Sequence, residues 1–236
     1  MLKRLNSPGF EAASKSSEDA VEVLRRVKAS ASGPVVAAEI GVGVGATTID
    51  LVRTLGGTGE LHLFDRETLV RDLIAELEEL PETAGVTLVD HGNSRKLFDG
   101  YAWVLATMAR DLASAGKSVE IFDFVYLDGA HSFHHDAPAC AILKRMLKPG
   151  GYLVLDDMKW TFNSSPSMNP TKRSDVRESY TDEQLSVPHV GLIADVLLRP
   201  DEEFEEISLT DNDDPGRAVF QRVQSRRRRW GSKRTS

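Results

Sequence analysis

Three carboxylates follow two short apolar runs in the middle of the chain. Asp128 comes directly after residues 122–127, and Asp156 and Asp157 come directly after residues 152–155. Neighbouring parallel strands bring their carboxyl ends to one crevice, so we expect these three side chains to lie close together. Carboxylates gathered in one place repel one another, and a hard divalent cation such as Mg²⁺ takes oxygen ligands. The spacing therefore predicts a metal site at the mouth of a sheet.

A second group of residues that could do chemistry is the glycine-rich segment EIGVGVGATT, between an apolar run and a helical pattern. Gly41, Gly43 and Gly45 allow the backbone to turn sharply and approach a ligand, and a helix N-terminus adds amide donors. Asp65 ends the next apolar run, 24 residues after Gly41. A carboxylate there can accept both hydroxyls of a ribose, which predicts a nucleoside-containing cofactor. The segment also satisfies G-x-G-x-x-A, the pyridine-dinucleotide fingerprint, so the nucleoside stays open at this point.

Alternating strand and helix patterns surround both groups of residues. Strands are expected at 35–40, 61–64, 86–89, 122–127 and 152–155. Helices are expected at 18–29, 47–55, 67–80, 95–115, 137–147 and 188–198. Such alternation predicts an α/β fold with a doubly wound, mainly parallel sheet. Two late apolar runs, at 204–209 and 218–223, predict an antiparallel pair that closes the sheet.

The length and composition fit one globular domain. With 236 residues, 41% of them hydrophobic, the chain can build a full core. We expect a single domain over residues 1–224, with an N-terminal helical segment at 1–34. Residues 158–187 are rich in Ser, Pro, Asn and charge, and so long a connection is often a lid. Residues 225–236 are a basic tail that we expect to be disordered.

The charge distribution argues against a surface that coats nucleic acid. The net charge is −7, yet residues 221–236 carry seven basic groups and no acidic ones, so the remaining residues sum to −14. An acidic body makes a nucleic-acid partner an unfavoured prediction. No apolar run is long enough to span a bilayer, residues 1–10 lack a signal peptide, and a single cysteine, Cys140, excludes an internal disulfide. We therefore expect a cytoplasmic protein without a membrane partner, and a buried, structural thiol.

Glu39 stands two residues before the first glycine and completes the pattern E-x-G-x-G-x-G. That pattern resembles motif I of the class I S-adenosylmethionine-dependent methyltransferases. The chain also lacks the Tyr-x-x-x-Lys pair of the short-chain dehydrogenases. Asp65 matches the family's acidic ribose-binding position. Gly92-Asn93-Ser94 falls where many members place Gly-Asp-Ser beside the adenine, although Asn93 departs from the commoner Asp.

The segment LKPGGYLVLDD looks like the family's fifth strand with the turn before it. The resemblance implies a seven-stranded, Rossmann-like methyltransferase fold and S-adenosylmethionine as the cofactor. It assigns cofactor binding to the residues that match the motifs, namely Glu39, Gly41, Gly43, Gly45, Thr47, Asp65, Asn93, Ser94 and Asp128.

The pattern D-G-x-H followed by an acidic pair resembles, within that superfamily, the metal-dependent sugar O-methyltransferases of the macrocin and mycinamicin type. The resemblance implies that Asp128, Asp156 and Asp157 bind Mg²⁺. Metal binding by this set stays open, because Asp156 could instead cap a loop and Asp128 could contact only the cofactor.

The same resemblance implies that Asp128 and His131 are catalytic, with His131 as the base. An imidazole has a pKa near neutrality, which suits proton removal. His134 and His135 follow in the same segment, and either is an alternative base. Consecutive residues rarely make a tetrahedral site, which disfavours zinc at these two histidines and Asp136.

The leading expectation is a Mg²⁺-dependent O-methyltransferase that acts on a hydroxyl of a sugar or glycosylated natural product. The metal would acidify and orient the hydroxyl, a base would remove its proton, and alignment would supply further acceleration. The partner would be a small-molecule hydroxyl acceptor, and a homo-oligomer is possible. The alternatives are a metal-free N- or C-methyltransferase, an RNA-directed protein using Arg226–Arg229, and a silent cofactor-binding scaffold.

Overall fold

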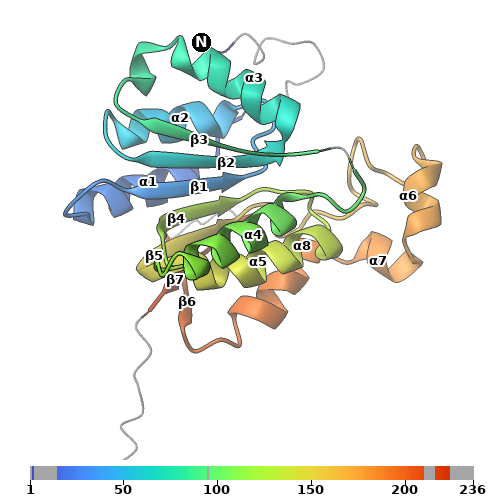
Figure 1. Cartoon of the computed structure of the whole chain (residues 1–236). Coiled ribbons are helices and arrows are strands. Elements are labelled where there is room, and N and C mark those ends of the chain that lie inside the picture. The colour runs from blue at the N-terminus through green and yellow to red at the C-terminus, as the bar shows by residue number, and fades with distance from the viewer. Residues whose placement is uncertain (1, 3–14, 95, 210–215, 224–236) are drawn as a thin grey trace, which may run out of the picture.

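The computed structural model describes residues 2, 15–94, 96–209 and 216–223. It contains a seven-stranded sheet in the order β3-β2-β1-β4-β5-β7-β6 (Figure 1). The strands are β1 (Val36–Ile40), β2 (Glu60–Arg66), β3 (Thr87–Asn93), β4 (Phe122–Leu127), β5 (Leu147–Leu155), β6 (Phe204–Ile207) and β7 (Ala218–Arg222).

Strand direction follows the expected pattern. The pairs β3-β2, β2-β1, β1-β4 and β4-β5 are parallel, whereas β7 is antiparallel to both β5 and β6. The register aligns Ile40 with Leu127 and Leu127 with Leu155, so β1, β4 and β5 end side by side. The α/β fold with a mainly parallel sheet and an antiparallel closing pair is confirmed. The residues that follow these three strands are brought to one edge.

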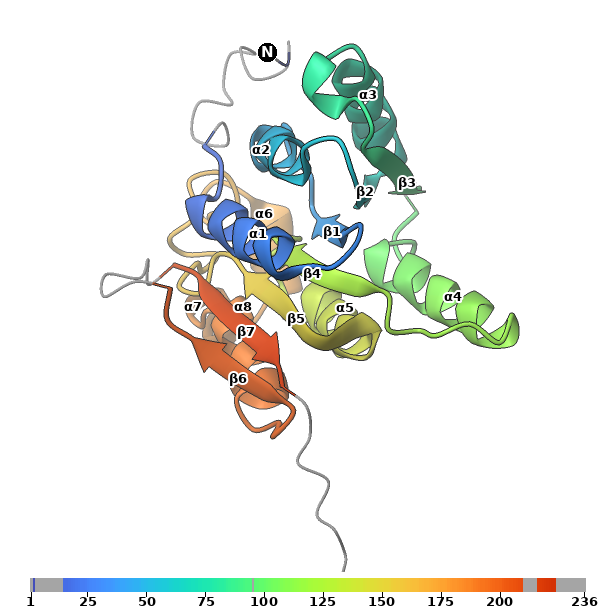
Figure 2. The same cartoon turned by 90° about the vertical axis from the view of Figure 1, so that its left-hand side faces the viewer.

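Helices cover both faces of the sheet (Figure 2). The first face is covered by α1 (Glu18–Ser30), α2 (Ala46–Leu55) and α3 (Glu67–Glu78). The other face is covered by α4 (Tyr101–Ser114), α5 (Phe133–Met146), α8 (His189–Ile193) and the π-helical turn η4 (Ala194–Leu198). A short 3-10 turn, η3 (Pro81–Thr83), precedes β3.

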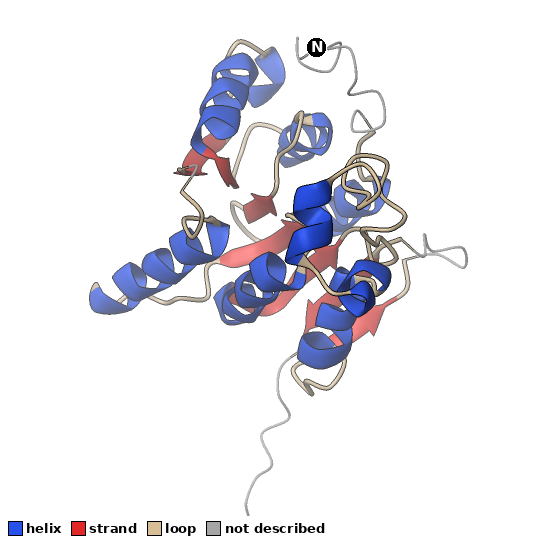
Figure 3. Ribbon diagram, turned by 90° about the vertical axis from the view of Figure 1, so that its right-hand side faces the viewer, coloured by secondary structure: helices blue, strands red, loops and turns tan. Residues whose placement is uncertain are grey.

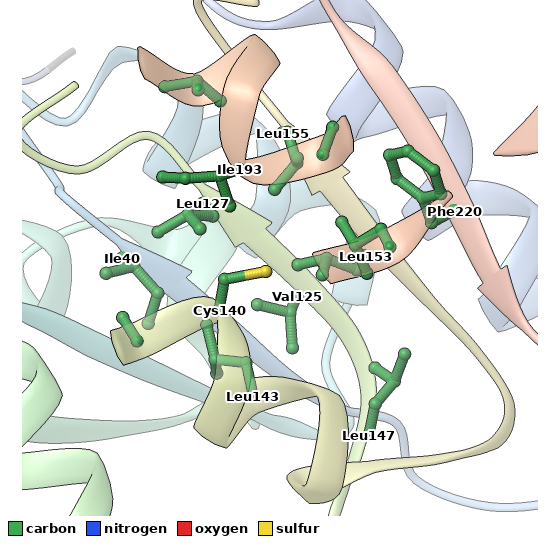
Figure 4. Packing of buried hydrophobic residues seen from close by; sticks show 14 of the residues in the cluster. Ile40, Val125, Leu127, Cys140, Leu143, Leu147, Leu153, Leu155, Ile193 and Phe220 are labelled. Carbon is green, nitrogen blue, oxygen red and sulfur yellow. The ribbon is translucent and has the colours of Figure 1, made fainter. Parts of the chain in front are cut away.

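The larger apolar core lies between the sheet and the α5 side of the molecule. Leu127 and Leu155 from the sheet pack with Leu143 and Ile193 from the helices (Figure 4). Cys140 belongs to this core and is fully buried. Because burial disfavours the thiolate, the pKa of Cys140 rises to about 12. The prediction that Cys140 is a buried, structural thiol is confirmed.

Several element boundaries differ from the expected ones. The helix expected from residue 95 begins only at Tyr101, after the extended Gly100, and β3 runs on to Asn93. In contrast, α5 begins at Phe133, four residues before the expected start. Turn-forming Gly and Asp residues around position 100 delay the one helix. The other begins after Ser132, whose amide donates to the Asp136 side chain in the first turn (3.0 Å).

Residues 158–187 are more ordered than a plain loop. They contain α6 (Ser174–Ser179) and α7 (Asp182–Ser186), which lie in the foreground of Figure 3, beyond the carboxyl ends of the strands. Phe162, Val176 and Leu185 form a small buried cluster of their own. The composition concealed this cluster because its apolar residues are far apart in the sequence. Movement of this segment as a lid stays a prediction.

Two further predictions concern the ends of the chain and membranes. The basic tail at 225–236 lies outside the described residues, as does most of the segment before residue 15. In the part of the chain that is described, no helix has the length and apolar character needed to cross a membrane.

Candidate active site

The carboxyl ends of β1 and β4 meet in a close backbone contact. Gly41, the first residue after β1, has φ 87°, and its amide donates to the carbonyl of Phe64 (2.8 Å). A Cβ at Gly41 would lie 1.9 Å from the carbonyl oxygen of Asp128. No other residue fits such a contact. The glycine loop is therefore held directly against the loop that carries the first predicted metal ligand.

Asp65 organises the glycine loop from the end of β2. Its Oδ2 accepts the amide of Val42 (3.0 Å) and, more distantly, that of Gly43 (3.4 Å). Gly43 has φ 50° and is exposed, and a Cβ there would meet nothing within 4 Å. The structure thus places Asp65 and the glycines together, as the sequence predicted, around open space that a ligand can enter.

Glu39 is the most buried acidic group beside this loop. Its side chain is on β1 and 1% exposed, and its Oε2 has no hydrogen-bond partner. Burial raises the pKa of Glu39 well above its ordinary range, the nearby Thr48 side chain opposes the rise, and Asp128 and Asp65 add to it. An unpaired buried carboxyl oxygen costs free energy, so it fits a ligand that brings a hydrogen-bond donor. The orphaned oxygen and the glycine cradle are both compatible with the expected cofactor.

The other cofactor residues taken from the resemblance have partners within the protein. The Thr47 hydroxyl accepts the amide of Ser17 (3.1 Å), and the Asn93 side-chain amide donates to the Asp65 carbonyl (2.8 Å). The Ser94 hydroxyl accepts the amide of Lys96 (3.2 Å). These contacts place Thr47 at α1 and Asn93 and Ser94 near Asp65. Contact of these three residues with the cofactor stays a prediction.

A compact group of ionisable side chains lies at the ends of β4 and β5. Asp128, His131 and Asp157 each offer a ligand atom, and these atoms all lie within 4.8 Å of one another. His131 lies between the two carboxylates. Its Nε2 is 2.9 Å from Asp128 Oδ1, and its Nδ1 is 2.9 Å from Asp157 Oδ2. Two of the three predicted metal ligands and the predicted base are thus in direct contact.

The backbone at this group is strained. Within the described residues, His131 (φ 53°) and Asp157 (φ 57°) are the non-glycine residues with positive φ. Such a conformation costs on the order of 1–3 kcal/mol and persists only where the surroundings enforce it. The two strained residues touch each other through their side chains. Strain at two contacting polar residues makes this group a candidate for a functional site.

The two carboxylates strongly affect the protonation of His131. Burial by itself lowers its pKa, but hydrogen bonds to Asp128 and Asp157, with their negative charges, raise it to about 10. Burial also raises the pKa of Asp128, against the lowering effect of His131. In this arrangement His131 is an imidazolium that bridges the pair. Its positive charge occupies the position between two carboxylates that a cation would favour.

Asp156 has a different environment from its neighbour Asp157. Its Oδ2 accepts from the Tyr126 hydroxyl and from Arg217 Nε (3.1 Å), and its Oδ1 accepts the amide of Asp157 (2.8 Å). The Tyr126 hydroxyl oxygen also lies 3.2 Å from Asp128 Oδ2. Asp156 therefore adjoins the group through Tyr126 but does not belong to the converging set. Whether it contacts a metal stays a prediction.

Sequence reasoning missed the residues that shape the loop carrying His131. Asp136 is 1% exposed and accepts from the Tyr101 hydroxyl and from the amides of Ala130 (3.2 Å) and Ser132 (3.0 Å). Burial, followed by the nearby charge of Asp136, raises the pKa of Tyr101. Asp136 could have been noticed from the sequence, because an acidic residue is favourable in the first turn of a helix. Nothing in the sequence marked Tyr101, Tyr126 or Arg217.

The alternative bases point elsewhere. His135 Nδ1 bonds the Ser132 hydroxyl (2.8 Å), and the His134 ring packs against His135 and Tyr180. Neither belongs to the group at Asp128 and Asp157. The Trp160 ring, in contrast, meets the His131 ring edge to face, with centroids 5.4 Å apart. Trp160 therefore forms part of the wall around His131.

The strand order, the glycine loop after β1 and the acidic end of β2 together define a Rossmann-like, nucleoside-cofactor-binding enzyme fold. Residues 38–158, more than half of the chain, match the family described as a methyltransferase domain. The chain belongs to this family and is an S-adenosylmethionine-dependent methyltransferase. The resemblance to the class I enzymes is confirmed.

Solved structures share the fold. The O-methyltransferase TomG from Streptomyces achromogenes, in complex with SAM, is 15% identical, with a TM-score of 0.57 over 94% of this chain and 90% of that chain. An O-methyltransferase from Bacillus cereus, in complex with SAH, is 15% identical, with a TM-score of 0.54 over 90% and 84%. Identities this low show the fold alone. No protein of curated function matches the sequence significantly.

Proposed function

We propose that this methyltransferase is a Mg²⁺-dependent O-methyltransferase whose acceptor is a hydroxyl of a sugar or glycosylated small molecule. The observation that carries the proposal is the strained group of Asp128, His131 and Asp157, directly beside the glycine loop. A methyl donor in that loop and an acceptor at the carboxylates would lie side by side. In-line displacement needs such a juxtaposition.

The cofactor residues of the proposal are those around the loop. Asp65 would receive the ribose hydroxyls of S-adenosylmethionine, and the open backbone at Gly43 would approach it. The unpaired Oε2 of Glu39 would accept a donor through the loop or through water. Asn93 and Ser94 would lie near the adenine. When bound, the sulfonium supplies an electrophilic methyl group.

The carboxylates of Asp128 and Asp157 would hold the metal, with Asp156 beside them. Mg²⁺ favours oxygen ligands and keeps positions that a substrate's vicinal oxygens can take, which acidifies the bound hydroxyl. Asp156, held by Arg217 and Tyr126, would fix the position of Asp157 by accepting its amide. Outer residues of this kind orient a metal's ligands.

His131 is the proposed base. Its ring nitrogens lie 2.9 Å from Asp128 and 2.9 Å from Asp157, so it would adjoin a hydroxyl held at either carboxylate. A cation on the carboxylates would offset the negative charge that now raises the pKa of His131. The neutral imidazole would then release one of its two carboxylate contacts and accept the hydroxyl proton at the freed nitrogen.

Chelation tests the metal. We expect methyl transfer to a vicinal-diol acceptor to fall at least about 100-fold with excess EDTA and to return with Mg²⁺, because an unassisted alcohol is a poor nucleophile. Asp157→Asn should lose activity to a similar extent while still binding S-adenosylhomocysteine in calorimetry. Asp65→Ala, in contrast, should lose that binding. Full turnover after exhaustive chelation would overturn the metal assignment and favour metal-free transfer.

A further inference from the structure

A cavity of about 460 Å³ lies between the N-terminal end of α5 and the helices α6 and α7. Its apolar lining comes from Met168, Val176 and Tyr180, and its polar lining includes His134, Ser179 and Gln184. A volume of this size falls within the range of about 300–1,000 Å³ that small-molecule sites occupy. Nothing proposed so far for the reaction uses this cavity.

The cavity is near the group that would hold the metal. His134, on its wall, is only three residues after His131, so their Cα atoms are at most about 11 Å apart. Aromatic rings join the two places without a break. The Trp160 ring contacts His131 (5.4 Å between centroids) and Phe162 (4.9 Å), and Phe162 contacts the Tyr180 ring (4.3 Å).

The cavity wall formed by residues 158–187 is held in place by its own buried packing. Phe162, Val176 and Leu185 are buried together, and Trp160, Met168 and Tyr180 pack against them. A capping box at Thr181 and Gln184 fixes the start of α7. Residues 158–187 therefore present a defined surface to the cavity. A segment that only connected β5 to α8 would not need its own buried cluster.

The cavity suits a neutral ligand with apolar and polar faces. The carboxylate of Asp175, which also lines it, is paired with Arg173 (2.6 and 2.9 Å), so no uncompensated charge is contributed there. The Ser179 hydroxyl donates to the Asp175 carbonyl (2.6 Å). Apolar contact would come from Tyr180, Met168 and Val176. A hydrophobic ring with a polar rim matches this lining.

We infer that this cavity binds the second ring of the acceptor, a neutral ring joined to the one that is methylated. The inference rests on the proposed function, because the metal-binding carboxylates fix the first ring. It names the substrate class of that site: a two-ring acceptor, such as an aryl glycoside, in place of a free monosaccharide. Trp160 and Tyr180, both packed on the buried Phe162, would line the path between the two rings.

Binding of two matched ligands tests the inference directly. Methyl and phenyl β-glucoside present the same hydroxyls and differ in the second ring. In calorimetry with the full chain, Mg²⁺ and S-adenosylhomocysteine, we expect the phenyl compound to bind at least about tenfold more tightly. Equal affinities, or no binding of the phenyl glucoside, would overturn the inference.

A pair of variants on α6 locates the effect. Ser179→Trp places an indole at the exposed rim of the cavity, and Glu178→Trp places one on the adjacent, exposed residue that does not line it. We expect Ser179→Trp to remove the tenfold preference for the phenyl glucoside without weakening the methyl glucoside. The control should behave like the wild type. A preference that survives in folded Ser179→Trp would place the second ring elsewhere and overturn the assignment.

Failure of this inference can be told from failure of the proposed function. The binding experiment measures no methyl transfer, whereas the proposed function stands or falls with Mg²⁺-dependent product formation. Mg²⁺-dependent methylation with no preference for the phenyl ring would overturn the second-ring site alone. Tight, Ser179-sensitive binding of the phenyl glucoside without any methylation would support the site and count against the O-methyltransferase activity.

Discussion

At the scale of single residues, the site depends on partly buried acidic groups whose partners differ. Asp156 is paired with Arg217 and Tyr126, whereas Asp157 faces His131, although the two carboxylates are neighbours in sequence. Asp157 has a positive φ of 57°, whereas Asp156 does not. Sequence spacing could predict that both acids end β5. It could not distinguish them, because Arg217 is 60 residues farther along the chain than Asp157.

Asp136 provides a test at this scale. It accepts the amides of Ala130 and Ser132 on either side of His131, so it should be a positioning residue for that imidazole. We expect Asp136→Asn to weaken Mg²⁺ binding about 10-fold, as supporting groups of metal sites commonly do. Isothermal titration with Mg²⁺ measures this effect. Tyr101→Phe removes one donor to Asp136 and keeps both amides, so it should weaken Mg²⁺ binding less. Unchanged Mg²⁺ affinity in Asp136→Asn would contradict the role.

At the scale of elements, strand ends were predictable and loop shapes were not. The runs 122–127 and 152–155 became the aligned ends of β4 and β5, because mostly apolar strands are buried on both faces of a parallel sheet. The helix expected at 95–115 starts six residues late, since the turn before it depends on Asp99 accepting the Ser94 amide. Tertiary contacts of this kind leave no periodic signal in the sequence.

The contact between the β1 and β4 loops gives a paired prediction. Gly41→Ala would put a Cβ 1.9 Å from the Asp128 carbonyl, so we expect the free energy of unfolding to fall by about 3 kcal/mol or more. Gly43→Ala has positive φ but open space, and should cost only about 1–2 kcal/mol. Urea unfolding of both variants measures the difference. Equal losses would show that the close contact is not a constraint.

A pair of histidines between β2 and β3 predicts a pH dependence. His62 Nδ1 and His91 Nε2 are 2.8 Å apart, and His91 stacks on Phe64. Burial, with the charge of His62, lowers the pKa of His91 to about 4, against the opposing charge of Asp90. Burial also lowers the pKa of His62, although Glu60 opposes it. Both rings are therefore neutral in the folded protein at neutral pH.

Because the pKa of His91 is lower in the folded protein than in the unfolded chain, acid should lower the free energy of unfolding. Between pH 6.5 and about 4 the unfolded chain binds a proton at His91 that the folded protein does not. Neutral His91 therefore makes its full contribution to the free energy of unfolding above pH 6.5. This contribution, on the order of 2 kcal/mol, is lost as the pH falls. Urea unfolding at a series of pH values should show a shallower decline for His91→Gln. The exposed His135→Gln is the control, and identical slopes for all three proteins would refute the role of His91.

At the scale of the whole molecule, one sheet edge gathers everything that the proposal uses. The residues assigned to the cofactor, the metal or the base lie between Glu39 and Asp157, in or just after the carboxyl ends of β1 to β5, with Thr47 in the first turn of α2. Residues 158–187 then pass across the same edge and supply the cavity wall. The antiparallel pair β6-β7 contributes the arginine that holds Asp156, since Arg217 directly precedes β7. Fold and site are therefore closely linked through the strand order.

The arginine-rich end of the chain, residues 225–236, tests whether that sheet edge suffices. We expect its deletion to leave kcat/KM for a small hydroxyl acceptor within about twofold, a change worth less than about 0.5 kcal/mol, because no assigned residue belongs to it. An RNA-directed enzyme would behave otherwise, since four consecutive arginines would supply most of the attraction to phosphates. Methyl transfer and electrophoretic RNA retardation, measured on both lengths of the protein, separate the two. A deletion that abolishes small-molecule turnover in a protein with unchanged thermal unfolding would show that the site extends beyond this edge.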